Sequence, residues 1–480
     1  MPLPILTVAE MRAWEKQTWA SGRTESEVIE RVGRELAQEA RALTKPGDRI
    51  LILAGKGHNG DDALASIPHL QDREFLTLRA ADPLRALDDW TTTVQSRGEP
   101  ERPRIGLIID GLFGIGLNRP LSKDWVAFIH TVNSCSIPIL AVDVPSGLDA
   151  DTGKNFGAAI NAAVTLTVGA PKKGLLAASA WPHVGKLKVT GDVGLIRREE
   201  NVLASGEMEW VQESDFEYFP PPRPVAGHKG TFGHLGIVAG SRGYHGAGIL
   251  AARGAQRAQP GLISLLTVEK AYVPIASQLQ SVMVDVWQAG KDIAPNCTAL
   301  LFGPGLEKIP RELQKQLVRA WREFPIPVVV DASGLNWLPR GEEELPGLRI
   351  ITPHPGEAAR MLGVSAAEVQ SNRLAALRSL QQDYNQCRVV LKGHQTLVGS
   401  PGQIPVINSS GTPELGQGGS GDLLGGFIAG LIAQPLLQKD PDQCLRYAVW
   451  KHGRAADRLS QQSKHWTVEE LAGSLESWTS

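Results

Sequence analysis

The chain has 480 residues, of which 42% are hydrophobic, and its 49 basic and 51 acidic side chains give a formal net charge of −2. This length favours two to three domains, each with enough apolar residues for a core of its own. The near-zero charge excludes binding to nucleic acid or anionic lipid through an excess of positive charge, so any partner must be recognised locally.

The four cysteines are widely spaced and form neither a CxxC pair nor a cluster with histidine. We therefore expect no disulfide framework and no zinc site, and a reducing compartment fits best. The first residues lack a basic segment followed by an apolar core, and no run of about 18 apolar residues occurs. We expect a cytoplasmic protein without a nucleic-acid or membrane partner.

The first half of the chain predicts a parallel sheet covered by helices. Apolar residues recur at helical spacing over residues 24–42, and a strand-like run follows at residues 49–54. Further strands are expected at residues 105–109, 139–142 and 164–168. Each run is short, apolar and followed by a polar or glycine turn, which is typical of central parallel strands.

A segment at residues 198–224 is acidic and then proline-rich, so we interpret it as a linker. The alternation of strands and helices resumes after it, with strands expected at residues 234–239, 262–267, 298–302, 327–330, 349–351 and 388–391. The sequence therefore predicts an α/β fold with two domains, residues 1–215 and residues 216–480.

Glycine is abundant, with 51 residues, and glycine-rich turns follow three strands of the first half, at residues 54–62, 110–121 and 142–153. Open α/β sheets bind ligands at this edge, where glycines let backbone N–H groups approach a phosphate or an ion. A single such turn could be only a tight connection. Three turns with Asn59, Asp110 and Asp143 at strand ends favour a site. Oxygens from Asn59, Asp110 and Ser146 suit a group-one or group-two cation better than zinc.

The motifs GKGHNGDD, DGLFGIGLNRPL, VDVPSGLDADTG and GAPKKG resemble the NAD(P)H-hydrate epimerase domain. The resemblance implies a Rossmann-like sheet that interconverts the R and S hydrates at carbon 6, with potassium near Asn59, Asp110 and Ser146. It also implies that Asp143 contacts the hydrate and relays a proton during ring opening and closure. The substrate contacts that it implies are Asn59, Gly60, Asp62, Gly114, Ile115, Gly116, Leu117 and Asp143.

The first turn departs from the family pattern GxGNNGGDG, because His58, Asp61 and Ala63 replace Asn, Gly and Gly. The Asp61 carboxylate would repel a dinucleotide phosphate, and the Ala63 methyl group would hinder a close backbone approach. A contact with Lys56 could offset Asp61. A first half that only binds, without catalysing, is therefore an alternative.

The second half contains GTPELGQGGSGDLLGGF at residues 411–427, which opens onto an apolar helix expected to end near residue 433. Small residues before a helix N-terminus direct free N–H groups and the positive end of the helix dipole at one point, which suits a phosphoryl group in transfer. Asp422 could accept a proton from the attacking hydroxyl. The alternative is that Asp422 only caps the helix, but a cap does not need four preceding glycines.

Other turns of the second half also favour a nucleotide site. Lys392 ends a predicted strand and begins KGHQT, which can place an ammonium and a hydroxyl beside phosphates. The glycines of FGPG at residues 302–305 allow the backbone of this turn to approach a ligand closely. Two prolines fix the direction of His354, although a histidine in such a turn is more often structural. Asp331 and Asn336 flank another turn and could be structural caps.

These motifs, with GHKGTFGHLGIVAGSRGYHGAG, resemble the ADP/ATP-dependent NAD(P)H-hydrate dehydratase of the ribokinase-like superfamily over residues 224–456. The resemblance implies that a nucleotide phosphorylates the 6-hydroxyl of the S hydrate and that loss of phosphate restores the ring, with Asp422 as base. The hydrate contacts that it implies are Ala247, Gly305, His354 and Asp422. The implied nucleotide contacts are Lys392, Gly393, His394, Gln395, Thr396 and Gly421.

The resemblance further implies magnesium, potassium and ADP or ATP, with ADP as first choice, and we expect a homo-oligomer. Glu307 replaces the last glycine of GPGLG, and ELGQ at residues 414–417 replaces GMAT, but neither change touches Asp422. The alternative function is a ribokinase-like small-molecule kinase with a non-catalytic N-terminal binding module. That enzyme would leave a stable phosphorylated product, whereas hydrate repair releases inorganic phosphate.

Overall fold

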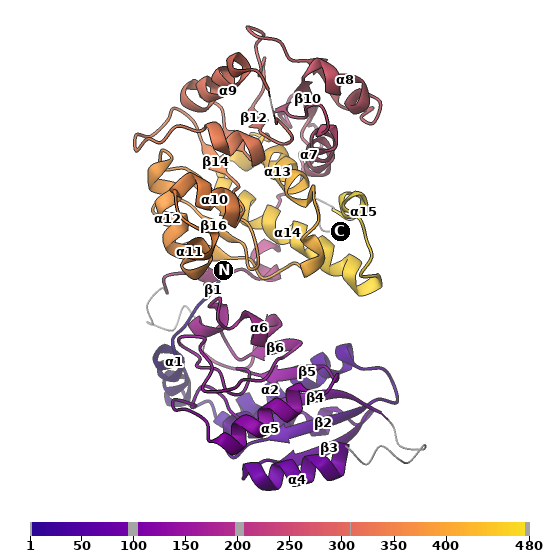
Figure 1. Cartoon of the computed structure of the whole chain (residues 1–480), viewed down its shortest axis with the longest axis vertical. Coiled ribbons are helices and arrows are strands. Elements are labelled where there is room, and N and C mark those ends of the chain that lie inside the picture. Colours follow the sequence, from indigo (N-terminus) through magenta and orange to yellow (C-terminus); the bar gives the residue numbers. More distant parts are fainter. Residues whose placement is uncertain (1, 95–103, 197–205, 308, 476–480) are drawn as a thin grey trace. The chain divides into compact units, whose positions relative to one another are not determined.

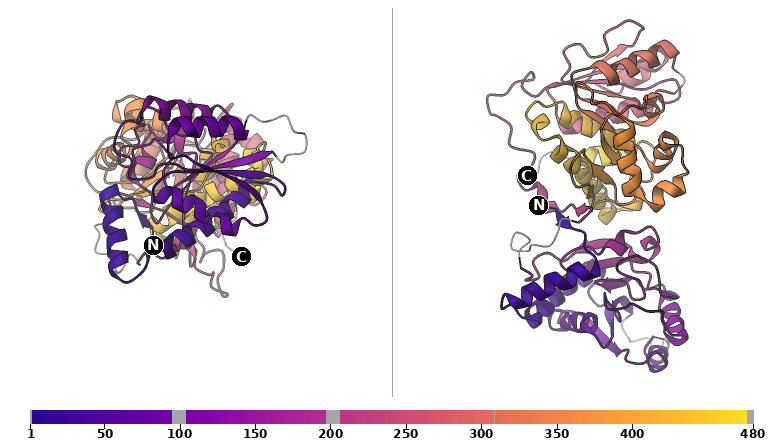
Figure 2. Two further views of the ribbon diagram at one scale, coloured as in Figure 1. Left: turned by 90° about the horizontal axis from the view of Figure 1, so that it is seen from below. Right: turned by 90° about the vertical axis from the view of Figure 1, so that its left-hand side faces the viewer.

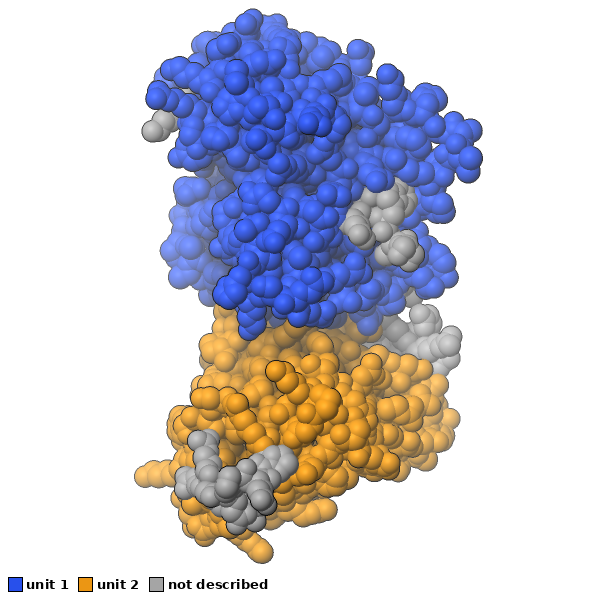
Figure 3. Space-filling model, turned by 90° about the vertical axis from the view of Figure 1, so that its right-hand side faces the viewer, with its two compact units in different colours: residues 1–2, 208–480 blue, residues 3–207 orange. Residues whose placement is uncertain are grey.

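The computed structural model describes residues 2–94, 104–196, 206–307 and 309–475 (Figure 1). The chain divides into two compact units, which Figure 3 shows in different colours. One is the N-terminal unit, Leu3–Glu207, and the other is the C-terminal unit, Met208–Ser480 with the first two residues. Each unit is built around a sheet covered by helices, so the predicted α/β class is confirmed.

The sheet of the N-terminal unit is parallel, with strand order β3-β2-β4-β5-β6-β7. Its strands are β2 (Arg49–Ala54), β3 (Glu74–Arg79), β4 (Ile105–Gly111), β5 (Ile139–Val142), β6 (Val164–Thr167) and β7 (Lys186–Val189). The four strands that the sequence predicts are the central ones. The edge strands β3 and β7 are partly exposed and carry charged residues, so no continuous apolar run marks them.

Helices cover both faces of this sheet, which Figure 2 (left) shows edge-on between two helical layers. The helices are α1 (Val8–Ala20), α2 (Glu25–Leu43), α3 (His58–Ala65), α4 (Pro83–Val94), α5 (Lys123–Asn133) and α6 (Trp181–Val184). Successive side chains of β2 point to opposite faces. Ile50 and Ile52 pack with Leu36 of α2, whereas Leu51 and Leu53 share a core with α4 and α5.

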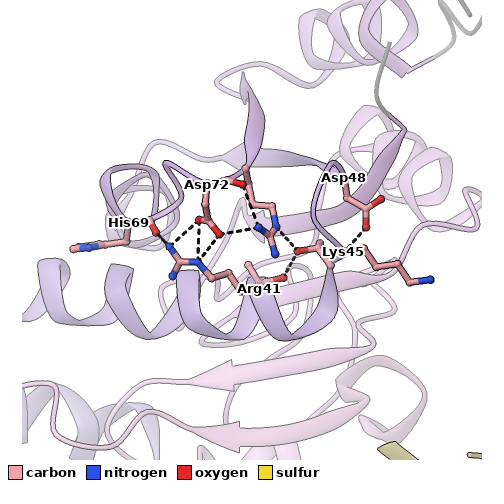
Figure 4. Close-up of polar contacts among 8 residues, drawn as sticks. Arg41, Lys45, Asp48, His69 and Asp72 are labelled. Atoms are coloured by element: carbon pink, nitrogen blue, oxygen red, sulfur yellow. Dashed lines mark hydrogen bonds and ion pairs between the residues drawn. The ribbon is translucent and has the colours of Figure 1, made fainter. Parts of the chain in front are cut away.

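Polar contacts fasten the C-terminal end of α2 to the segment before β3 (Figure 4). The Arg41 guanidinium donates from Nε to both carboxylate oxygens of Asp72, at 3.0 and 3.1 Å, and from Nη2 to the His69 carbonyl. Hydrogen bonds from Arg41 hold the pKa of the Asp72 carboxyl below its usual value. The Lys45 amide donates to Asp48 Oδ2 at 2.7 Å, which closes the turn into β2.

In the C-terminal unit the strands follow the order β8-β17-β16-β15-β14-β13-β12-β9-β10-β11. Neighbouring strands are parallel along the part of the sheet ordered β15-β14-β13-β12-β9-β10-β11. Strand β16 is antiparallel to both of its neighbours, β15 and β17. The strands are β8 (Glu209–Trp210), β9 (His234–Val238), β10 (Leu262–Thr267), β11 (Met283–Val286), β12 (Ala299–Phe302), β13 (Val328–Val330), β14 (Arg349–Ile351), β15 (Arg388–Leu391), β16 (Leu397–Gly399) and β17 (Val406–Ile407). All six predicted strands are present.

The helices of this unit include α13, which is buried along nearly its whole length and packs against α7, α14 and α15. They are α7 (His245–Ala258), α8 (Glu269–Ala276), α9 (Arg311–Glu323), α10 (Pro355–Leu362), α11 (Ala366–Ser371), α12 (Arg373–Asp383), α13 (Ser420–Ile432), α14 (Pro441–Gln462) and α15 (Val468–Ser474). Glycines let α13 and α7 touch: a Cβ on Gly426 would lie 1.9 Å from the Ala251 carbonyl oxygen, and one on Gly254 would lie 2.0 Å from that of Leu423. This contact fixes the start of α13 in the unit.

The linker expected at residues 198–224 is only partly correct. Residues 197–205 lie outside the described residues, but β8 pairs in parallel with β17. Phe216 then packs on Tyr447 and Trp450, with ring centroids 5.4 and 5.0 Å apart. The units therefore divide between Glu207 and Met208 instead of after residue 215, because a two-residue strand and single aromatic anchors leave no apolar period in the sequence.

The cysteine side chains form no disulfide among the described residues, and Cys297, Cys387 and Cys444 are buried. Burial raises the pKa of the Cys297 thiol to about 11, so this group stays protonated and unreactive. Across the described ranges, no helix combines the length and apolar character needed to span a bilayer.

Candidate active sites

In the N-terminal unit, turns at the carboxyl ends of β2, β4, β5 and β6 border a cavity of about 790 Å³. The predicted site residues that line it are Asn59, Asp62, Gly114, Ile115, Gly116, Leu117 and Asp143. Gly60 is not part of the lining. A Cβ there would lie 2.3 Å from the Gly55 carbonyl oxygen, so Gly60 allows the first turn to fold tightly on itself.

Asp143 follows β5 directly and adopts a left-handed backbone conformation, with φ 61°. Its Oδ1 accepts hydrogen bonds from Lys172 Nζ at 2.5 Å, Thr167 Oγ1 at 3.1 Å and the Val168 amide at 2.9 Å. Its Oδ2 accepts no hydrogen bond from the residues that the structure describes. One oxygen is therefore fixed, and the other is available to a ligand in the cavity.

Lys172 is a site residue that our sequence analysis did not single out. Its side chain is fully buried, and besides Asp143 its ammonium contacts Thr167 Oγ1 at 3.1 Å and the Val168 carbonyl at 2.7 Å. A buried ammonium requires such partners. The signal in the sequence is the GAPKKG turn after β6, in which the first lysine points inward and Lys173 outward.

Two more carboxyl groups line the cavity, and both have raised pKa values. Burial, then the charges of Asp143 and Asp61, raise the pKa of Asp62 to about 8, although Lys172 opposes this shift. Burial and then Asp143 also raise the pKa of Glu15. Glu15 lies on α1, and an ordinary helical glutamate gives no sequence signal. The cavity can thus hold a protonated carboxyl group beside the Asp143–Lys172 ion pair at neutral pH.

The predicted cation ligands also come together. Asp110 accepts from Ser146 Oγ at 2.7 Å and from the Ser146 amide at 2.9 Å. The backbone N–H of Phe113 donates to Ser146 Oγ at 2.8 Å. The carbonyl oxygen of Phe113 accepts a hydrogen bond from Asn59 Nδ2 at 2.9 Å. This hydrogen bonding leaves Asn59 Oδ1 facing Gly114, where an added Cβ would lie 3.1 Å away. The result is a compact group of hard oxygen atoms.

Two of the three residues that differ from the family pattern in the first turn, Asp61 and Ala63, do not line the cavity as we expected. Asp61 is exposed and does not line the cavity, and no ion pair joins it to Lys56 in the part of the chain that the structure describes. Ala63 is buried beneath Gly111, where a Cβ would come within 2.6 Å of the Ala63 methyl group. That methyl group therefore fills core space. His58 lines the cavity and lies 2.7 Å from Glu25.

In the C-terminal unit, the carboxyl ends of β13 and β15 present an ion pair to the start of α13. Lys392 Nζ lies 2.6 Å from Asp331 Oδ1, and both side chains are largely buried. A Cβ on Gly421 would lie 3.1 Å from Lys392 Nζ, and one on Gly425 would lie 3.1 Å from Asp331 Oδ2. Glycine at both positions therefore lets the helix approach the pair. Asp331 does not act as a side-chain cap.

Asp422 lies in the first turn of α13, next to this ion pair. The N-cap is Gly419, at φ 96°, so the alternative that Asp422 only caps the helix is wrong. Burial and then the neighbouring Asp331 raise the pKa of Asp422 to about 7, against the opposing charge of Lys392. A carboxyl group with a pKa near neutrality is suited to accept a hydroxyl proton and release it again.

His354 and Gly305 bring two more turns to this edge. His354 is the N-cap of α10, and its Nδ1 accepts from the Gly356 amide at 3.0 Å while Glu357 accepts from the His354 amide at 2.8 Å. The cap fixes a ring that is still half exposed. Gly305 has φ 63°, and a Cβ there would lie 2.9 Å from Ala247 Cβ, so these two predicted residues lie side by side.

The predicted nucleotide turn, residues 392–396, is held by a residue that sequence reasoning missed. Arg373 donates to the Leu391 carbonyl at 2.9 Å and the Lys392 carbonyl at 3.3 Å. Within the turn, Thr396 Oγ1 donates to the Gly393 carbonyl at 3.0 Å, and Gly393 has φ 125°. Burial and then Arg373 lower the pKa of His394, which favours its neutral form. Gln395 completes the turn at φ 52°.

In the C-terminal unit, Glu307 and the ELGQ segment, which differ from the family pattern, make local hydrogen bonds. Glu307 Oε1 accepts from Ser333 Oγ at 2.9 Å. Gln417 donates to the carbonyls of Glu414 at 2.9 Å and Trp466 at 3.1 Å, which ties the glycine loop to the segment before α15. Both changes therefore support their loops.

Both halves of the chain match families of known proteins. The family model for NAD(P)H-hydrate dehydratase matches residues 235–476, and that for the YjeF-related protein N-terminus matches residues 25–174. The bifunctional NAD(P)H-hydrate repair enzyme Nnr of Coxiella burnetii is 33% identical over 476 residues and covers 94% of each chain. The chain belongs to the family of bifunctional NAD(P)H-hydrate repair enzymes. The Escherichia coli relative is 32% identical over 456 residues, with 92% of this chain and 86% of its own covered.

Solved structures place the C-terminal half of this repair enzyme in its fold class. A ribokinase-like protein from Enterococcus faecalis superposes with a TM-score of 0.50 at 24% identity, covering 57% of this chain and 95% of its own. An ADP/ATP-dependent NAD(P)H-hydrate dehydratase from Bacillus subtilis, crystallised with ATP and Mg²⁺, is 31% identical over 53% of this chain and 91% of its own, with a TM-score of 0.48. The first of these similarities confirms the predicted ribokinase-like fold. The family model and the curated relatives do not favour a vitamin or sugar kinase.

Proposed function

We propose that the chain repairs hydrated NADH and NADPH. The N-terminal unit interconverts the R and S hydrates, and the C-terminal unit uses a nucleotide to dehydrate the S form and releases phosphate. The observation that carries this proposal is that one chain holds both the Asp143–Lys172 pair at a cavity and Asp422 beside Lys392 at the start of a buried helix. Family membership supports the same pair of activities.

Dehydration begins when the 6-hydroxyl of the S hydrate attacks the terminal phosphoryl group and Asp422 takes its proton. The free N–H groups at the start of α13 and the Lys392 ammonium stabilise the charge that develops on the phosphoryl oxygens. Loss of phosphate from C6 and of a proton from C5 then restores the dihydronicotinamide ring. Gly305, Ala247 and His354 line the edge where the hydrate would lie.

The nucleotide that we propose is ADP, with ATP as the alternative, bound along residues 392–396 and Gly421. Within the described residues, no group of three or more His, Cys, Asp or Glu side chains could hold a metal ion. Magnesium usually keeps several waters and binds through substrate phosphates with one or two carboxylates. It would therefore enter with the nucleotide, and Asp331 and Glu357 are the carboxylates that could hold its water shell.

The decisive experiment incubates the full-length protein with mixed R and S hydrates and either ADP or ATP. We expect both isomers to be consumed, the absorbance of the reduced nicotinamide to return completely, and inorganic phosphate to appear in equal amount. A stall after the S form is used up would contradict the epimerase, and a stable phosphorylated product would contradict the dehydratase.

Asp110 fits the potassium ion that the family implies. Its carboxylate is fully buried, and burial raises its pKa to about 6 despite the hydrogen bonds from Ser146 and Leu112. No lysine or arginine pairs with it among the residues that the structure describes. A monovalent cation held by Asp110, Ser146 and Asn59 would supply the missing positive charge and anchor the turn after β4.

We expect potassium to stabilise the N-terminal unit. At ten times its dissociation constant, a ligand adds about 1.4 kcal/mol, or roughly 3–6 °C in the midpoint of thermal unfolding. Calorimetry in potassium chloride against choline chloride measures this shift. Asp110→Asn should abolish the difference, whereas Asp124→Asn, an exposed carboxylate on α5, should keep it. Equal midpoints of the wild type in both salts would contradict the site.

A further inference from the structure

The cavity of the N-terminal unit presents two carboxyl groups whose surroundings differ. We propose that Asp62 and Asp143 form a donor–acceptor pair for the epimerisation, in which Asp62 gives a proton to the ring nitrogen while Asp143 takes one from the 6-hydroxyl. The inference rests on the epimerase activity proposed above and assigns the proton donor that this activity requires.

Asp143 is built as the acceptor. Its Oδ1 is used by Lys172, Thr167 and Val168, and the ammonium at 2.5 Å balances its charge. Its Oδ2 accepts no hydrogen bond from any residue that the structure describes, and Asp143 lines the cavity. The free oxygen can therefore receive a proton without breaking the contacts that hold the carboxylate in place.

Asp62 is built as the donor. It lies on α3 at the same cavity, is partly buried, and neither accepts a side-chain hydrogen bond nor forms an ion pair within the described part of the chain. The buried ammonium of Lys172 is committed to Asp143. A carboxyl group that shares a cavity with an ionised neighbour and lacks a cation of its own retains its proton, and its pKa of about 8 agrees.

Every charged group that faces Asp62 has to be considered in its titration. Asp143, Asp61 and Glu15 favour the protonated form and Lys172 opposes it, with burial as the largest influence. The cavity is also lined by the charged or titratable residues Arg12, Glu25, Lys56, His58 and Arg119. His58 is occupied by Glu25 at 2.7 Å. Of the charged groups that act on the pKa of Asp62, three carboxylates therefore raise it and one ammonium lowers it.

The proton transfers balance without a further reactant. Asp143 Oδ2 accepts the 6-hydroxyl proton, the C6–O bond becomes a carbonyl, and the C6–N1 bond breaks as Asp62 protonates N1. The electron pair on N1 is delocalised into the ring's carboxamide-bearing double bond. Rotation about C5–C6 exposes the other face of the aldehyde. N1 then attacks, returns its proton to Asp62, and the oxygen recovers its proton from Asp143.

The test follows conversion of the pure R hydrate to the S hydrate by the full-length protein without nucleotide. Asp62→Asn should lower the turnover number about 100-fold, the scale of a missing general acid. Asp61→Asn, the adjacent carboxylate outside the cavity, should stay within about twofold of the wild type. Hydrogen exchange in peptides that contain β2 and β5 of the same Asp62→Asn protein, slowed as in the wild type, shows that the N-terminal unit is folded.

The pH profile separates this role from simple substrate binding. Because the protonated form of Asp62 acts, wild-type epimerisation should fall as the pH rises through about 8, and Asp62→Asn should lack this decline. If Asp62→Asn matches Asp61→Asn, or if Glu15→Gln abolishes the decline instead, the assignment of Asp62 is overturned while the epimerase stands. If the wild type does not accelerate the reaction, the epimerase proposal itself fails.

Discussion

Replacing Asp422 with asparagine should lower the turnover of nucleotide-dependent dehydration by at least ~100-fold, because the variant has no carboxylate to take the proton of the attacking hydroxyl. Nucleotide binding should change little, since Lys392 and the turn at residues 392–396 keep their contacts with Asp331 and Arg373. Single-turnover release of phosphate measures the chemical step, and calorimetric titration with ADP measures binding. The isosteric amide keeps the shape of the first turn of α13.

The pH dependence of this reaction follows from the same carboxyl group. Burial and Asp331 raise the pKa of Asp422 to about 7, so the ionised form that acts as base is lost as the pH falls below about 7. Wild-type turnover should decline over that range, and Asp422→Asn should be low and flat. Asp292→Asn, an exposed carboxylate before the amino end of β12, should behave like the wild type. Near-normal turnover of Asp422→Asn would place the base elsewhere.

The central strands could be predicted from the sequence because they are buried on both faces. RILILA at Arg49–Ala54 and LISLLT at Leu262–Thr267 are nearly continuous apolar runs, which parallel sheets require. The edge strand β11 (Met283–Val286) alternates exposed and partly buried residues and carries Asp285, so nothing in its composition separates it from a loop. The two-residue strands β8 and β17 depend on their pairing alone.

The site residues that could be predicted are those that follow a strand. Asp143 and Lys392 come directly after β5 and β15, and parallel strands bring their carboxyl ends to one edge. Their partners depend on register and on turns. Val142 pairs with Leu166, which places Asp143 opposite Thr167, and the turn after β6 then carries Lys172 back to it. Neither this contact nor that of Lys392 with Asp331 has a fixed sequence spacing.

Replacing Lys172 with methionine should destabilise the N-terminal unit by about 3–5 kcal/mol, because the change removes one partner of a buried ion pair and leaves a charge without compensation. The Lys172 side chain is fully buried and that of Asp143 is 11% exposed. Methionine keeps most of the volume, so the loss reports charge more than packing. Urea unfolding of the full chain, read by hydrogen exchange in peptides that contain β5 and β6, measures the free energy of unfolding of this unit.

The neighbouring lysine supplies the matched control. Lys173 pairs with Glu207 at 3.3 Å, but both side chains are more than half exposed, so Lys173→Met should cost no more than about 0.5 kcal/mol. Asp143→Asn added to Lys172→Met should recover part of the lost stability, since an amide at residue 143 no longer buries an unpaired charge while it can still accept from Thr167 and Val168. If the two changes add without recovery, Lys172 stabilises the unit through packing, and the ion pair is not what holds Asp143 at the cavity.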